Sequence, residues 1–426
     1  MKKIILVLFL MAVVSVSCDD RLVDLNTPRK AATVVPGQTL FTNGLKEMVD
    51  QLQTINVNLG VFKLYSQYWA QATYPEESQY NMVTRNIPEN MYENMYRDAL
   101  RDLTDGRAAI EALGEGALAS DIKKNQLATF DVIMVWTWSF LVDTFGHVPY
   151  DEALDPENLN PAYGDMGLIY TSIIDKLDAA ISALDPNVSG ISAAQDPVYN
   201  GDVAAWKVAA NSLKFRLAMR LADSDPGKSV SMANAALSSG IITSNADNFA
   251  LNYLVAPPNT NPQYEDLVLS GRSDFIGANT LVDKMNGLND PRRPIFFKQN
   301  LGDGVYEGGI YGDANSFKNF SQIGDIFHTP DLPGTIINAS EMHFLMAEAV
   351  ERGGYSVSGT AEAHYNAGIT ASMEEWGVAA ADIPAYLAQP EVAYATAEGR
   401  GASWKQKIGT QFWLAMFNNG YEGWTV

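Results

Sequence analysis

The sequence predicts an all-α protein, with one helical body that is interrupted by a long, irregular, loop-rich insert. From about Leu40 onward, apolar residues recur at spacings of three and four, which is the period of an amphipathic helix. The segment Leu127–Phe145 is apolar on nearly every face, which is typical of a central helix packed on several sides. Between residues 241 and 339 only Asp274–Leu288 keeps the helical period, and glycine, proline, asparagine and aspartate crowd together. Long irregular stretches of this kind are usually functional.

The first twenty residues predict where the protein works. Lys2 and Lys3 precede the apolar run Ile4–Val14, which is shorter than the roughly 20 residues that a membrane-spanning helix needs. A basic start, a short apolar run and small residues are typical of a secretory signal peptide. Because Cys18, the only cysteine, follows, the pattern resembles a bacterial lipobox, which implies that residues 1–17 are removed and that Cys18 is acylated. The alternative is a core helix that ends in a chance cysteine.

The remaining chain divides into a polar tether and one body. We expect the lipidated N-terminus and tether at residues 18–38 and a single helical body at residues 39–426. The expected helices are Leu59–Ala72, Ile87–Leu113, Leu127–Phe145, Tyr163–Leu184, Asp202–Ala222, Pro226–Gly240, Asp274–Leu288, Ser340–Glu351, Thr360–Trp376 and Ser403–Phe417. Asp202 and Ser340 are the expected N-caps of their helices. Successive helix pairs over this length are typical of an α-solenoid or a large bundle.

Charge and motifs exclude several classes of function. The formal charge is −21, or −23 once Lys2 and Lys3 leave with the signal peptide, which argues against nucleic acid as a partner. It also argues against electrostatic adhesion to anionic lipid, so membrane contact should run through Cys18. The phosphate-loop and dinucleotide motifs are incomplete, and the four histidines lack metal-ligand spacing. We therefore expect no cofactor, no metal site and no catalytic residue, although a glycosidase carboxylate pair or a calcium ion among the acidic turns stays open.

Aromatic residues are the best candidates for ligand contacts. A sugar ring presents a flat C–H face that packs on an aromatic plane, while nearby polar groups bind its hydroxyls. One group of aromatics lies at the end of an expected helix and in the loop after it, and another lies in or beside the insert. The predicted ligand-binding residues are Trp69, Tyr74, Tyr80, Tyr264, Tyr306 and Tyr311. The alternative is that these rings only pack in the core.

Several segments, in a consistent order, resemble the SusD/RagB family of outer-membrane nutrient-capture lipoproteins, and specifically its SusD-like second group. These segments are Cys18–Asp20, Phe145–Tyr150, Tyr170–Ile181, Trp206 with Ala210–Arg220, Asn289–Arg292, Ser340–Ala349, Tyr365–Ile369, Gln411–Phe417 and Gly420–Trp424. The resemblance implies an α/α superhelix with four tetratricopeptide-like helix pairs, facing outward from the outer membrane. It also implies a SusC-like TonB-dependent transporter as partner. The family's ligands are mostly glycans, with peptides in some branches, and they bind to variable loops, so no ligand residue transfers by motif.

Family members usually continue past the segment that resembles Gly420–Trp424, whereas this chain stops at Val426, so we expect a truncated C-terminus. The leading hypothesis is a non-catalytic surface lipoprotein that captures an oligosaccharide and delivers it to the transporter. A peptide-capturing lipoprotein of the same architecture is the second hypothesis. A glycan-cleaving enzyme is the third and comes from a different functional class.

Overall fold

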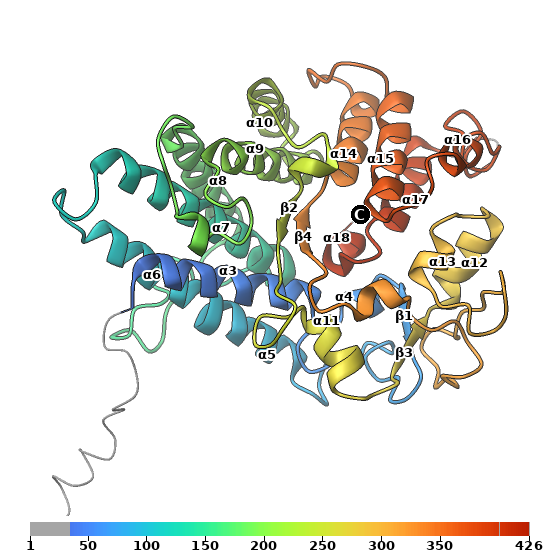
Figure 1. Cartoon of the computed structure of the whole chain (residues 1–426). Coiled ribbons are helices and arrows are strands. Elements are labelled where there is room, and N and C mark those ends of the chain that lie inside the picture. The colour runs from blue at the N-terminus through green and yellow to red at the C-terminus, as the bar shows by residue number, and fades with distance from the viewer. Residues whose placement is uncertain (1–34, 400, 426) are drawn as a thin grey trace, which may run out of the picture. The chain divides into compact units, whose positions relative to one another are not determined.

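Helices dominate the computed structural model, which describes residues 35–399 and 401–425 (Figure 1). The predicted signal peptide, the acylated Cys18 and nearly all of the tether lie outside the described residues. The part of the chain from Gly37 onward forms one compact unit, and it is described by itself here. The longer helices are α3 (Gly37–Gln53), α6 (Arg101–Glu111), α7 (Ser120–Phe145), α8 (Met166–Ala183), α9 (Val203–Arg220), α10 (Pro226–Ser239), α14 (Ala339–Arg352), α15 (Ala361–Glu375) and α17 (Trp404–Ala415). The predicted all-α class is confirmed.

The closest packing occurs within pairs of helices: α3 with α6, α7 with α8, α9 with α10, and α14 with α15. Shorter helices connect or follow them: α4 (Phe62–Tyr65), α5 (Ile87–Glu93), α11 (Pro262–Tyr264), α12 (Asn279–Gly287), α13 (Arg293–Phe296), α16 (Asp382–Leu387) and α18 (Gly420–Thr425). Two small antiparallel sheets join distant segments. In the first, β1 (Trp69–Gln71) pairs with β3 (Phe275–Gly277), and in the second, β2 (Phe249–Leu251) pairs with β4 (Gly334–Ile337).

The helix α7 is the core helix that its all-round apolar sequence predicted. By length and composition it passes as a membrane span, but 72% of its most apolar window is buried inside the protein. Its neighbours α6, α8 and α9 cover it, and its largest rings, Trp136 and Phe140, stack at 5.6 Å between centroids. Burial by protein on several sides explains why this helix needs no polar face.

Capping residues fix the helix ends, and one predicted cap is wrong. Asp202 accepts hydrogen bonds from the backbone N–H groups of Ala204 and Ala205, as predicted for an N-cap. The cap of α14 is Asn338 rather than Ser340, since the Asn338 side chain accepts from the N–H of Glu341. The hydroxyl of Ser340 instead donates to the carbonyl of Gly368 on α15, 2.7 Å away, and so joins the two helices.

Three predicted helices differ from the structure. The expected helix Leu59–Ala72 is helical only over α4, because Gln67 has a φ of 58° and Trp69–Gln71 forms β1. Pairing with β3, about two hundred residues later, overrides the local helical period there. The expected helix Asp274–Leu288 likewise begins with β3 and becomes helical only in α12. The helix Ile87–Leu113 is interrupted by a π-helical segment, Asn94–Leu100.

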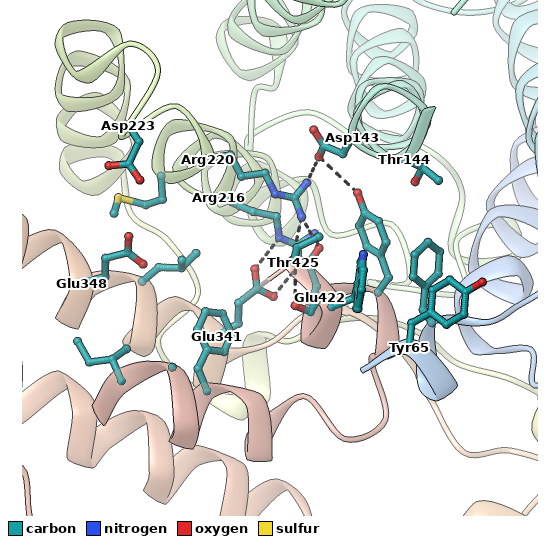
Figure 2. A pocket seen from close by; sticks show the side chains of 18 of the residues that line it. Tyr65, Asp143, Thr144, Arg216, Arg220, Asp223, Glu341, Glu348, Glu422 and Thr425 are labelled. Carbon is teal, nitrogen blue, oxygen red and sulfur yellow. Dashed lines mark hydrogen bonds and ion pairs between the residues drawn. The ribbon is translucent and has the colours of Figure 1, made fainter. Parts of the chain in front are cut away.

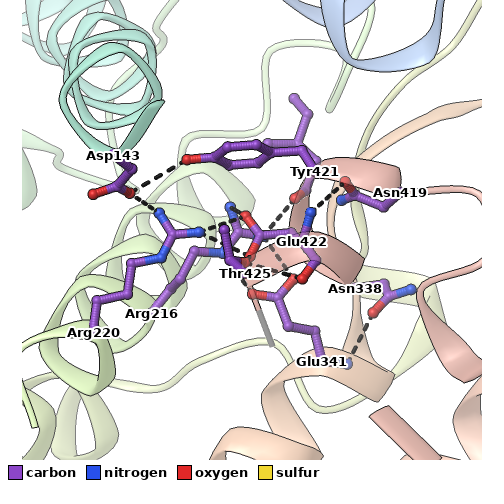
Figure 3. A network of polar contacts seen from close by, with 10 residues as sticks. Asp143, Arg216, Arg220, Asn338, Glu341, Asn419, Tyr421, Glu422 and Thr425 are labelled. Carbon is purple, nitrogen blue, oxygen red and sulfur yellow. Dashed lines mark hydrogen bonds and ion pairs between the residues drawn. The ribbon is translucent and has the colours of Figure 1, made fainter. Parts of the chain in front are cut away.

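A cavity of about 880 Å³ lies where α7, α9, α14, α17 and α18 meet (Figure 2). Charged side chains from four of these helices form a buried network along its wall (Figure 3). Arg216 on α9 binds both carboxylate oxygens of Glu341 on α14, at 2.5 and 2.6 Å, and contacts Glu422 on α18 at 3.1 Å. Arg220 on α9 pairs with Glu422 and with Asp143 on α7.

Burial and charge oppose each other in this network. The side chains of Arg216 and Glu341 are only 3% and 1% exposed, so water screens neither of them. Burial raises the pKa of Glu341, and the charge of Arg216 only partly offsets this. Burial acts on Glu422 in the same direction, but Arg216 and Arg220 together bring its pKa below the ordinary value. Each carboxylate therefore depends on the arginines to stay ionised.

A second buried charge lies on α4. The Lys63 ammonium donates to the carbonyl of Gln53 at 3.1 Å and lies 5.4 Å from the ring centroid of Trp69. Burial lowers the pKa of Lys63 to about 7, and the nearby charge of Asp266 opposes the shift only weakly. Folding therefore moves this amine from an ordinary value of 10.5 to near neutrality.

Removing one partner of the buried network should destabilise the fold strongly. We expect Arg216→Ala to lower the free energy of unfolding by about 3–5 kcal/mol, because Glu341 would be left buried and unpaired. The matched control is Arg97→Ala, which removes an exposed arginine paired with Asp98 and should change the stability little, because water screens that pair. Urea unfolding of both variants measures the difference. Similar small losses in the two variants would show that the network contributes little.

Lys63 should give the stability a characteristic pH dependence. Between pH 7 and pH 10.5 the unfolded chain holds a proton on Lys63 that the folded chain has lost, so stability rises with pH in this window. Relative to Lys63→Met, the wild type should gain about 1.4 kcal/mol per pH unit there. The exposed Lys124→Met is the control. If the stabilities of the wild type and Lys63→Met change with pH in parallel, the pKa of Lys63 is not lowered in the folded protein.

Candidate functional site

The loop that follows β1, residues 72–86, is held from beneath by buried polar side chains. The amide of Gln71 donates to a carboxylate oxygen of Glu77 at 2.6 Å and accepts from the hydroxyl of Ser78 at 2.9 Å. The other oxygen of Glu77 accepts from Arg85 at 2.5 Å. Gln71, Glu77 and Ser78 are all buried, so the loop is fixed at its base while its aromatic residues point outward.

Two aromatic residues of this loop are exposed and adopt an unusual backbone conformation. Tyr74 is 60% exposed with a φ of 57°, and Tyr80 is 49% exposed with a φ of 61°. Bulky side chains rarely adopt positive φ, and such strain persists mainly where the surrounding structure imposes it, often at functional sites. The guanidinium of Arg85 lies 5.9 Å from the ring centroid of Tyr74 and limits its movement.

The irregular insert reaches this loop and adds a third aromatic residue. The amide of Asn315 donates to the carbonyl of Gln71 at 3.0 Å, and the amide of Gln79 donates to the carbonyl of Gly312 at 2.8 Å. These bonds place Tyr311 beside Tyr80. Burial raises the pKa of the Tyr311 hydroxyl, and the neighbouring Tyr80 adds to the shift. The fold thus brings Tyr311, which is distant in the sequence, into the same region as Tyr74 and Tyr80.

Two further rings extend the site toward the last helix. Tyr65 lies 4.9 Å from Tyr80 and 5.6 Å from Trp424, between ring centroids. We call the set Tyr311, Tyr80, Tyr65 and Trp424 the aromatic row. Trp424 is 48% exposed, whereas burial, aided by Tyr80 and Glu77, raises the pKa of Tyr65 to about 12. The sequence favoured a packing role for Tyr65 and gave no sign of Trp424 as a ligand candidate, because only the tertiary fold joins α4 to α18.

The other predicted ligand residues lie elsewhere. Trp69 is 1% exposed and packs against Phe275 in the core, so it offers no face to a ligand in this structure. Tyr306 is also buried, with the guanidinium of Arg293 5.4 Å from its ring centroid. Tyr264 is half-buried on α11, which packs near α3. Within the described residues, none of the three makes a ring contact with the aromatic row.

The cavity adjoins the row and shares Tyr65 and Trp424 with it, and Met82 of the loop 72–86 also lines it. Figure 2 shows Tyr65 on one side of the cavity and Asp223 and Glu348 on the other. Its volume of about 880 Å³ is within the range of small-molecule sites. The row and the cavity together offer a surface with flat aromatic faces and a partly polar recess.

The five carboxylates that line the cavity are all paired with arginines. Asp143, Glu341 and Glu422 pair with the two arginines of α9, as described above. Asp223 and Glu348 both pair with Arg352 at 2.6 Å. A glycosidase needs one carboxyl group poised as an acid and another free as a base or nucleophile. The arrangement suits binding better than catalysis.

Comparison with known proteins identifies the family. Residues 28–426 match the SusD-like_2 family model, described as starch-binding and associating with the outer membrane. A chitin-binding SusD homolog from Flavobacterium johnsoniae has a similar structure, with a TM-score of 0.74 and 26% sequence identity over 91% of this chain and 84% of that chain. No curated protein matches the chain.

Two further solved structures share the fold. A SusD homolog from Parabacteroides distasonis has a TM-score of 0.76 and 24% identity, covering 91% of this chain and 82% of that chain. A SusD homolog from Bacteroides uniformis has a TM-score of 0.72 and 24% identity, covering 90% and 85%. These matches confirm the tetratricopeptide-like helical superhelix that the resemblance implied. The chain belongs to the SusD-like family of non-catalytic binding proteins that associate with the outer membrane.

Proposed function

We propose that this protein is a surface lipoprotein that captures an oligosaccharide and passes it to a SusC-like TonB-dependent transporter. In this proposal residues 1–17 are a signal peptide, Cys18 carries the lipid, residues 18–38 form the tether, and residues 39–426 form the binding body. The aromatic row, with the exposed Tyr74 beside it, is the observation that carries the proposal. Family membership supports the binding role and the outer-membrane location.

The chemistry of the row suits sugars. Its exposed rings, Tyr80 and Trp424, can pack against the C–H surfaces of sugar units, and the buried Tyr65 supports them from between. Polar side chains at the same place can bind hydroxyls: Gln79, Asn81 and Arg85 lie on the loop that carries Tyr74 and Tyr80. Chitin oligosaccharides are the first ligands to test, because a structural relative with 26% identity is chitin-binding. Starch oligosaccharides are the second, from the family description.

Truncating an exposed ring should weaken glycan binding without unfolding the protein. We expect Tyr74→Ala to raise the Kd for an oligosaccharide about 5- to 30-fold, as for the loss of a contact worth about 1–2 kcal/mol. The control is Tyr163→Ala, which removes a 70% exposed tyrosine outside the row and should leave the Kd unchanged. Isothermal titration calorimetry with chitin and starch oligosaccharides measures both.

Equal affinities for Tyr74→Ala, Tyr163→Ala and the wild type would place the ligand away from this loop. Binding of peptides by the wild type, with no response to any glycan, would favour the peptide-capturing alternative of the same architecture.

Trp69 should behave as a core residue. We expect Trp69→Ala to lower the free energy of unfolding by about 3–5 kcal/mol, because it leaves a cavity beneath β1 and β3. Tyr74→Ala, at an exposed position, should change it by less than about 1 kcal/mol. Chemical denaturation compares the two. A Trp69→Ala protein that is fully stable and binds glycan poorly would instead assign Trp69 to the ligand site.

A further inference from the structure

Two histidines on neighbouring helices face each other at a place separate from the aromatic row. His343 is on α14 and His364 is on α15, and their Nδ1 atoms are 3.3 Å apart. The two rings are nearly parallel, with centroids 5.6 Å apart and an angle of 28° between their planes. Both residues are half-buried.

The hydrogen bonds on the far side of each ring fix the protonation pattern. The Nε2 atom of His343 is 3.2 Å from the carbonyl oxygen of Thr243, and that of His364 is 2.8 Å from the carbonyl oxygen of Ser358. A carbonyl oxygen only accepts, so each Nε2 carries the hydrogen. In the neutral state each Nδ1 atom therefore carries a lone pair, and the two atoms lie 3.3 Å apart.

Two facing lone pairs need a positive species between them, which is either a shared proton or a metal ion. The separation of 3.3 Å exceeds the usual length of a nitrogen hydrogen bond. It agrees instead with two imidazole nitrogens bound to one tetrahedral zinc ion at about 2.0–2.1 Å each. Histidines that bind metal typically donate their other N–H to a carboxylate or backbone carbonyl, as both do here.

We propose that His343 and His364 bind one divalent transition-metal ion through their Nδ1 atoms. Imidazole ligands favour Zn²⁺ and Cu²⁺, with Cu²⁺ held more tightly. No group of three or more histidine, cysteine, aspartate or glutamate side chains is arranged to hold a metal within residues 35–399 and 401–425. Water or an external ligand therefore fills the remaining positions.

The ion would join α14 to α15, the helix pair whose register also depends on the Ser340–Gly368 hydrogen bond. A metal that binds only the folded state stabilises it by mass action. The site therefore has two measurable consequences, binding and thermal stabilisation, and neither depends on the proposed glycan function.

The test is calorimetric titration of untagged protein with Zn²⁺ and with Cu²⁺ after chelator treatment. All proteins carry Cys18→Ser, because the thiol would bind these metals. We expect one equivalent per chain, and a loss of affinity of at least about tenfold in His343→Ala and in His364→Ala. The control is His147→Ala, whose Nδ1 accepts the N–H of Met166 in the starting structure, and it should bind as the wild type does.

Two further readouts separate metal ligation from a structural role. Electron paramagnetic resonance of the Cu²⁺ complex should show coupling to two imidazole nitrogens, and to one in each single variant. Zn²⁺ should raise the thermal unfolding midpoint of the wild type and leave that of His364→Ala unchanged. If the wild type does not bind the metal, or if binding survives when both His343 and His364 are replaced by alanine, the proposal is wrong. The two histidines would then share a proton.

Discussion

Two arginines on α9, Arg216 and Arg220, fix the place where four helices meet. A buried guanidinium must find its carboxylates within the protein, because removing it from water costs several kcal/mol that only close ion pairs offset. The partners come from α7, α14 and α18, so the ion pairs hold elements that are far apart in the sequence. Apolar packing alone tolerates sliding of one helix on another, whereas bidentate contacts at 2.5–2.6 Å, as between Arg216 and Glu341, do not.

The aromatic site depends on this anchoring through α18. Glu422 ties that helix to α9, and Trp424 follows two residues later against Tyr65. The helix also approaches the segment between α4 and β1 very closely: a Cβ atom on Gly423 would clash with the hydroxyl of Tyr68. Glycine is therefore required there. The ion pairs and this close approach together determine where the end of the aromatic row lies.

The local sequence pattern predicted the long helices. It did not predict the features that depend on contacts between segments far apart in the chain. Helices α8 and α9 were predicted from the spacing of their apolar residues, and α7 was predicted from its all-round apolar sequence. The region around Trp69 has the same spacing, but backbone pairing with Phe275–Gly277 makes it a strand, and no local pattern reveals that partner. Tyr74, Tyr80 and Tyr311 were identified from the chemistry of aromatic faces. Trp424 was missed because its proximity to Tyr65 exists only in the folded chain.

The histidine pair shows the same limit for metal sites. Spacing rules detect ligands on one helix or in one loop, and His343 and His364 are on different helices. Their approach requires the register of α14 on α15, and their ligand-like protonation requires the carbonyls of Thr243 and Ser358 from two other segments. Neither requirement has a sequence signature.

The exposure of the aromatic row bears on how a captured ligand is released. A pocket that surrounds its ligand buries most of the ligand's surface and gains affinity by doing so. Here Tyr74, Tyr80 and Trp424 each remain about half open to water, so in the proposed function each ring would contribute a separate, modest contact. The affinity for the proposed sugar chain would then accumulate over several rings, and each sugar could leave its ring without the whole ligand dissociating. Such graded binding suits a protein whose proposed role is to hold a glycan and then pass it on.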